Sequence, residues 1–173
     1  TDTLDGDTTS LSTLLANKGA DGKISLREAI TAANNTANGT GGADRINFNI
    51  AASGVQTITL ASSLPSVTDT VIIDASTEPG YATSPMVVLN GNASVSNVLT
   101  LSGASANGST VRGLAINNFT GYGIWITGSS NNLIVANYVG TDATGSSAVG
   151  TTVANGIALN NANNNVIGGS TAA

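Results

Sequence analysis

The chain repeats itself at a long interval, and this feature constrains the fold more than any other. Segment 123–127 (GIWIT) matches segment 156–160 (GIALN), which follows it by 33 residues. Segments 131–134 and 164–167 match more weakly at the same offset. Self-similarity at such an interval is typical of repeat architectures, in which each unit packs only on its neighbours.

An earlier copy of the repeat is shorter. Segment 98–101 corresponds to 123–126 at 25 residues, and segment 111–116 to 134–139 at 23. We interpret the polar, glycine-punctuated segment 140–150 as a loop inserted into the longer copy. A period of about two dozen residues fits a parallel β-helix or a leucine-rich repeat. The leucine pattern of the latter is absent, so the sequence predicts an all-β fold, a single-stranded parallel β-helix.

The expected strands alternate between apolar and polar residues. Ile124 and Ile126 should point inward and Trp125 outward. Earlier expected strands cover 45–50, 57–60, 71–73 and 86–89. The turns between strands are rich in asparagine, which tolerates the left-handed backbone of tight corners and can hydrogen-bond along the stack of repeats.

Composition excludes several classes of protein. Only 9% of residues are charged, too few for a helical bundle, while 40% are hydrophobic, too many for a disordered chain. The absence of cysteine and histidine removes thiolate chemistry and the commonest general base. Five Lys and Arg against a net charge of −5 predict no nucleic-acid partner, and no apolar run is long enough for membrane insertion.

The sequence predicts only one helix, over residues 25–34. Ser25 and Glu28 form a capping-box pattern at its start. Its apolar residues fall at helical spacing: Leu26, Ala29, Ile30 and Ala33. We expect this helix to cover the open apolar end of the solenoid, so that 1–43 form an N-terminal cap and 44–173 form coils that continue beyond residue 173 in the natural protein.

The loop before this helix resembles a calcium-binding loop. Segment 17–28 fits an EF-hand register, with Asn17, Asp21 and Glu28 as candidate calcium ligands. Position three is Gly19, which offers no side-chain ligand, and we expect no helix before the loop. The alternative is that Glu28 only caps the helix. A second acidic cluster is interpreted as a solvated terminus: Asp2, Asp5 and Asp7.

Segments 4–10 and 19–30 together resemble the CSLREA-type N-terminal segment of large bacterial secreted proteins, with Ile24 in place of the usual cysteine. Segments 73–81, 111–114 and 137–145 are similar to the β-helix coils that follow in those proteins. The resemblance implies a right-handed parallel β-helix of the pectate-lyase-like superfamily, in an extracellular or cell-surface protein. It supplies no catalytic residues.

Candidate site residues are few. Asp74 and Glu78 flank a turn and form the best carboxylate pair for a glycosidase-like site, although no basic partner or aromatic platform is evident beside them. The alternative is that Asp74 ends a strand and Glu78 lies on a turn. Trp125 and Tyr138 are outward aromatic residues that could stack on a sugar or pack against loops.

Three functions are compatible with these features. The first is a non-catalytic scaffold or adhesion module that presents strand faces to a carbohydrate or protein partner. The second is a fragment of a polysaccharide lyase or glycoside hydrolase. The third, ice or crystal binding, is weak because the Thr57-Ile58-Thr59 unit does not recur. We also expect end-to-end self-association through the open C-terminal coil.

Overall fold

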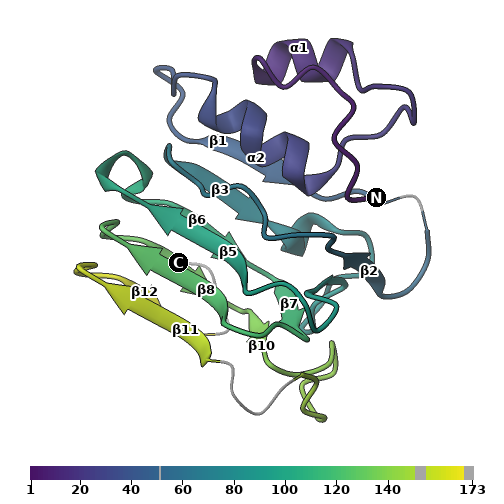
Figure 1. Ribbon diagram of the computed structural model, residues 1–173, viewed down its shortest axis with the longest axis vertical. Coiled ribbons are helices and arrows are strands. Elements are labelled where there is room, and N and C mark those ends of the chain that lie inside the picture. The colour runs from purple at the N-terminus through teal and green to yellow at the C-terminus, as the bar shows by residue number, and fades with distance from the viewer. Residues whose placement is uncertain (51, 151–154, 170–173) are drawn as a thin grey trace.

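The computed structural model describes residues 1–50, 52–150 and 155–169. Within them the protein is mostly β-structure, with the two α-helices gathered at one end of a stack of strands (Figure 1). The helices are α1 (Leu11–Ala16) and α2 (Leu26–Asn34), with the short 3-10 helices η1 (Ala75–Thr77) and η2 (Ala104–Ala106). No helix in these ranges is long and apolar enough to cross a membrane.

The strands are β1 (Asp44–Asn47), β2 (Gln56–Thr59), β3 (Val71–Asp74), β4 (Val87–Asn90), β5 (Asn97–Ser102), β6 (Thr110–Arg112), β7 (Leu114–Asn117), β8 (Tyr122–Thr127), β9 (Leu133–Val135), β10 (Tyr138–Val139), β11 (Asn155–Asn160) and β12 (Val166–Ile167). They form three parallel sheets: the first is β1-β3-β6-β9-β12, the second β2-β4-β7-β10 and the third β5-β8-β11. From β3 onward the chain visits the three sheets in turn, so neighbouring strands of a sheet come from consecutive repeats.

The strand register confirms the repeat predicted from the sequence. Ile157 pairs with Ile124 and Ile167 with Ile134, the expected offset of 33 residues. Ile124 also pairs with Leu99, and Ile134 with Val111, at the shorter offsets. Segment 140–150 folds back on itself through an antiparallel bridge between residues 141 and 148, outside the named strands. An insertion of this kind leaves the pairing of the strands on either side unchanged.

Side chains from all three sheets meet in one core. Ile124 and Ile126 are fully buried and Trp125 is partly exposed, as the alternation predicts. Burying such an isoleucine side chain contributes about 1.5–3 kcal/mol. The core is therefore a column of stacked aliphatic residues, one layer for each repeat.

Polar side chains connect the repeats along one column of the first sheet. The backbone N–H of Val71 donates to Oγ of Ser109 (3.1 Å), and that of Ser109 donates to Oδ1 of Asn132 (2.9 Å). The backbone N–H of Asn132 in turn donates to Oδ1 of Asn165 (2.8 Å). Asn132 also donates to Asn165 through its side chain, which confirms the expected bonding between stacked asparagines. Each repeat thus supplies an oxygen to the repeat before it.

The corners also use asparagine as the sequence predicts. Five asparagines have the left-handed backbone: Asn92, Asn118, Asn131, Asn161 and Asn164. Asparagine tolerates this conformation better than most residues because its short polar side chain can bond locally. At these five corners the chain therefore changes direction with little backbone strain.

Helix α2 forms where the sequence predicts it. Ser25 is its N-cap, and both halves of the capping box with Glu28 are present. Leu26, Ile30 and Ala33 are buried and join the core beside β1, so α2 covers that end of the stack.

The prediction of a single helix is wrong. α1 also forms, capped reciprocally by Ser10 and Thr13. It was missed because threonine, rather than the usual Glu or Gln, completes its capping box, and because it has only six residues.

A matched pair of substitutions tests the layered core. Ile124→Ala should lower the free energy of unfolding by about 3 kcal/mol, because it leaves a cavity in a fully buried layer. Ile157→Ala, in register with it but partly exposed, should cost less than half as much. Urea denaturation of both variants measures the difference, and equal costs would contradict this assignment of layers.

Candidate functional site

Two aromatic side chains lie together on the third sheet. The rings of Tyr122 and Trp125 on β8 have centroids 5.9 Å apart and planes tilted by 34°. Both side chains are partly exposed. Simple alternation would place Tyr122 inward with Ile124. The alternation instead breaks at Gly123, which is buried and lies close to Val139 on the second sheet. A Cβ atom there would lie 2.7 Å from Cγ1 of Val139, so only glycine fits.

The strands on either side place small uncharged residues around this pair. Thr100 and Ala158 are in register with Trp125, and Asn97 and Asn155 with Tyr122. Two positions further along each strand, the next outward-facing residues are polar and form a row across the sheet: Ser102, Thr127 and Asn160. We call these nine residues the Trp125 surface; Thr100 is buried, and the other eight are partly or fully exposed. The strands β5, β8 and β11 contain no charged residue.

The polar row is available to a ligand. The side chains of Ser102, Thr127 and Asn160 make no hydrogen bond to any part of the chain that the structure describes. Hydroxyl and amide groups beside partly exposed aromatic rings are suited to a ligand that has both apolar faces and hydroxyl groups.

The structure separates the two aromatic residues singled out in the sequence. Tyr138 lies on β10 in the second sheet, where its ring packs against Gly145 of the insertion. A Cβ atom on Gly145 would lie 2.9 Å from the Tyr138 ring. Trp125 instead pairs with Tyr122. Sequence reasoning missed Tyr122 because it has the inward parity of the strand.

Asp74 is anchored rather than exposed. Its Oδ1 accepts hydrogen bonds from the backbone and hydroxyl of Ser76 (3.0 and 2.6 Å) and from Nε of Arg112 (2.7 Å). Burial alone would raise the pKa of Asp74, but the bonds from Arg112 and Ser76, with the charge of Arg112, hold it below its ordinary value. The expectation that no basic partner lies nearby is wrong, because Arg112 on β6 is in register with Asp74 on β3.

Glu78 is buried, with 2% of its surface exposed, so it does not simply decorate a turn. Its Oε2 accepts the backbone N–H of Ile50 (2.9 Å), which ties the end of η1 to the chain after β1. Its Oε1 is buried without a hydrogen-bond partner in the described chain. Asp74 and Glu78 therefore stabilise turns, and neither presents its carboxylate to solvent.

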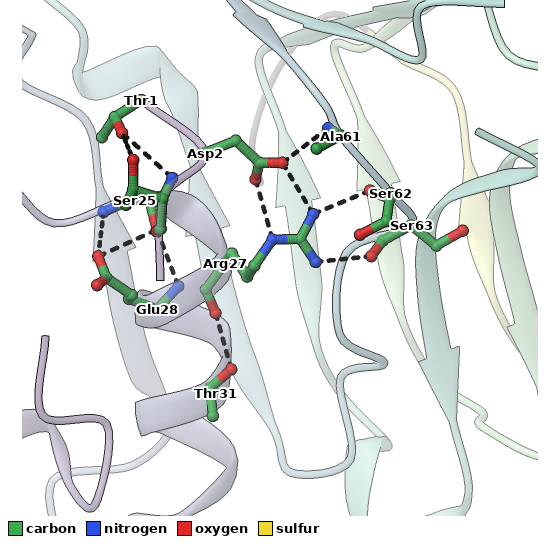
Figure 2. Close-up of polar contacts among 10 residues, drawn as sticks. Thr1, Asp2, Ser25, Arg27, Glu28, Thr31, Ala61, Ser62 and Ser63 are labelled. Atoms are coloured by element: carbon green, nitrogen blue, oxygen red, sulfur yellow. Dashed lines mark hydrogen bonds and ion pairs between the residues drawn. The ribbon is translucent and has the colours of Figure 1, made fainter. Parts of the chain in front are cut away.

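Glu28 is also fully engaged. Its Oε1 accepts the backbone N–H groups of Asp5 (2.8 Å) and Gly6 (2.7 Å), and its Oε2 accepts the N–H (2.8 Å) and Oγ (3.0 Å) of Ser25. Figure 2 shows the Ser25 side of this network. Burial opposes ionisation, but these bonds together lower the pKa of Glu28. A cation at this carboxylate would have to displace backbone donors.

The other two candidate calcium ligands have local roles. Asn17 is the C-cap of α1, so a helix does precede this loop, contrary to expectation. Oδ1 of Asp21 accepts the backbone N–H of Lys23 (2.8 Å). Across the described ranges, no group of three or more Asp or Glu residues is arranged to hold a metal ion. The calcium loop stays a sequence-based hypothesis.

The acidic N-terminus is tied to the fold through hydrogen bonds, while Asp5 stays exposed to solvent, as expected. Asp2 forms an ion pair with Arg27 (2.9 Å) and accepts the N–H of Ala61, while Arg27 also donates to the carbonyls of Ser62 and Ser63 (Figure 2). Asp5 accepts the N–H groups of residues 20 and 21 (2.7 and 3.1 Å). The first residues therefore connect α2 to the chain after β2.

No protein-family model, no curated protein and no solved structure matches this chain. Function is therefore inferred from the geometry of its own surfaces.

Removing the charge of Glu28 should destabilise the protein in a pH-dependent way. Its lowered folded-state pKa means that the ionised carboxylate stabilises the fold above its unfolded pKa of about 4.3, and that this contribution is lost as pH falls through the lower folded value. Glu28→Gln should cost about 2–4 kcal/mol at pH 7. The cost should shrink below about pH 4. Urea denaturation from pH 3 to 8 measures both; a cost that does not vary with pH would contradict the role of the charge.

Calcium should leave the melting temperature unchanged, because the Glu28 oxygens are already occupied by N–H and O–H donors. Thermal melts with millimolar calcium and then with excess chelator test this. A calcium-dependent rise that Asp21→Ala abolishes would instead establish segment 17–28 as a calcium site.

Proposed function

We propose that this chain is a non-catalytic carbohydrate-binding module built on a right-handed parallel β-helix. Three parallel sheets that the chain visits in rotation support the β-helix. The position of α2 at the β1 end supports its role as the N-terminal cap. The observation that carries the binding function is the pairing of Tyr122 with Trp125 on an uncharged strand face.

The Trp125 surface fits the chemistry of a sugar. A pyranose ring has apolar C–H faces that stack on aromatic rings and hydroxyl groups at its edge that exchange hydrogen bonds. Trp125 and Tyr122 supply the platform. The polar row of Ser102, Thr127 and Asn160 supplies donors and acceptors in the adjoining register.

The absence of charge on this face selects among carbohydrates. The strands β5, β8 and β11 hold no Asp, Glu, Lys or Arg, while the whole chain has a net charge of −5. An acidic polysaccharide would meet no compensating cation on this face and would be repelled by the net charge. The ligand is therefore a neutral glycan, and its binding depends little on ionic strength.

The setting proposed for this module is extracellular, on a bacterial secreted or cell-surface protein with an adhesive role. Support comes from the resemblance of segments 4–10 and 19–30 to the CSLREA-type segment, which brings no catalytic residues. The engagement of Asp74 by Arg112 and Ser76 gives no support to the alternative of a polysaccharide-cleaving enzyme.

Binding can be measured through Trp125 itself, since it is the only tryptophan in the chain. Titration with soluble neutral polysaccharides (glucan, xylan, mannan) should change its fluorescence, whereas polygalacturonate should not. Trp125→Ala should weaken binding about 5- to 150-fold, the loss expected from about 1–3 kcal/mol of stacking and buried area. Because this substitution removes the fluorophore, its binding is measured by affinity electrophoresis.

Tyr138→Ala is the matched control. It removes a partly exposed aromatic side chain from the second sheet and should leave glycan affinity unchanged. Equal loss in both variants would point to a general effect on folding. Unchanged binding in Trp125→Ala would remove the Trp125 surface as the binding face.

A further inference from the structure

Five asparagines of this chain are followed two positions later by serine or threonine, the pattern of an acceptor for N-linked glycosylation. The pairs are Asn34 with Thr36, Asn38 with Thr40, Asn92 with Ser94, Asn107 with Ser109 and Asn118 with Thr120. A sequence this rich in asparagine, serine and threonine contains such pairs through its composition alone. Which of them can accept a sugar depends on whether the folded chain leaves the side-chain amide and the hydroxyl free.

Three of these asparagines use the amide nitrogen, the atom that would carry the sugar, inside the fold. In each of them Nδ2 donates a hydrogen bond to an oxygen of a residue far away in the sequence: Asn34 to Ser66 (2.7 Å), Asn38 to Thr70 (2.9 Å) and Asn118 to Asn90 (3.0 Å). The Oδ1 atoms of Asn34 and Asn38 also accept backbone N–H groups (both 2.8 Å). A sugar at any of the three would break bonds that hold distant segments together.

The pair of Asn107 and Ser109 is closed at its hydroxyl end. Ser109 is fully buried, and its Oγ donates to the carbonyl of Ala106 (2.8 Å) and accepts the backbone N–H of Val71 (3.1 Å). Oδ1 of Asn107 accepts the N–H of Ser130 (2.6 Å). An enzyme that recognises the hydroxyl therefore cannot reach it while this repeat is folded.

The pair of Asn92 and Ser94 is free at both ends. It lies on a turn between β4 and β5, in which the carbonyl of Gly91 accepts the N–H of Ser94 (3.1 Å). The central residues Asn92 and Ala93 have positive φ angles of 53° and 52°, as in a type I′ turn. Residues 92–94 are exposed. Neither the side-chain amide of Asn92 nor the hydroxyl of Ser94 makes a hydrogen bond with any part of the chain that the structure describes.

We propose that the folded protein accepts an N-linked sugar at Asn92. The donor is a sugar activated at C1 as a diphosphate ester of a nucleoside or of a lipid. Nδ2 of Asn92 forms a bond to C1, and the bond from C1 to the phosphate oxygen breaks. The diphosphate leaves with the bonding electrons, and a base of the transferase takes the proton from Nδ2. The hydroxyl of Ser94 positions the turn in the transferase.

This modification is independent of the function proposed for the other face. None of the nine residues of the Trp125 surface lies on the turn of residues 91–94. Loss of glycan binding at Trp125 and loss of sugar attachment at Asn92 are therefore separate outcomes, each measured by its own experiment.

Two parallel reactions on the purified, folded chain test the acceptor and identify the donor. One contains a soluble N-glycosyltransferase with UDP-glucose. The other contains membranes with an oligosaccharyltransferase and its lipid-linked oligosaccharide. Mass spectrometry of proteolytic peptides should find an adduct on Asn92 alone in at least one reaction. Its mass, that of a single hexose or of an oligosaccharide, identifies the donor.

Substitutions on the turn test the amide and the hydroxyl separately. Asn92→Asp removes the amide but tolerates the positive φ angle, and Ser94→Ala removes the hydroxyl, so each should lose the adduct completely. Ser94→Thr should keep it. Asn161→Asp is the matched control, since Asn161 is also exposed with a positive φ angle but has no serine or threonine two positions later. This variant should be modified like the wild type.

Circular dichroism and thermal melts verify that every variant is folded. A wild type that stays unmodified in both reactions would overturn the proposal, as would an adduct that persists in Asn92→Asp or Ser94→Ala. Adducts at the other four asparagines as frequent as at Asn92 would also overturn it, because the fold would then not select the site.

Discussion

Hydrogen bonding between parallel strands of consecutive repeats is the interaction on which the rest of this structure depends. It fixes the register that stacks Leu99, Ile124 and Ile157 in one column of the core. The ladder of side-chain oxygens through Ser109 and Asn132 repeats the same connection outside the strands. Since each repeat contacts only its neighbours, outward residues can vary without disturbing the core. A terminal repeat has a neighbour on one side only, so its exposed core residues need a separate cover.

Much of this arrangement was predictable because the number of residues between matching sequence segments equals the number between paired strand residues. The recurrence of apolar pairs such as Ile124 and Ile126 gave the repeat, and the polar stretch 140–150 gave the insertion. Tyr122 was not predictable, because its outward position depends on a break in alternation at Gly123, where the crowding by Val139 leaves no room for a Cβ atom. The pairing of Asp74 with Arg112 joins residues 38 apart and follows only from the register of β3 with β6.

The unequal numbers of acidic and basic residues determine which groups the carboxylates bind. The chain has ten Asp and Glu but only five Lys and Arg, so many carboxylates have no cation to pair with. Glu28 and Asp5 instead accept backbone N–H groups in the N-terminal region. Carboxylates placed in this way, whether buried like Glu28 or exposed like Asp5, satisfy donors that helix starts and loops leave unpaired. These carboxylates therefore stabilise the conformation of the N-terminal region.

The helix at one end and the bare strands at the other give the molecule a direction. Within the described residues β11 and β12 each pair with a strand on one side only, whereas β3 and β6 pair on both sides, so the hydrogen bonds of β11 and β12 should open more readily. Amide hydrogens of β11 and β12 would then exchange with solvent sooner than those of β3 and β6. Local opening of the described part of the chain would then begin at these two strands and reach the inner repeats only afterwards.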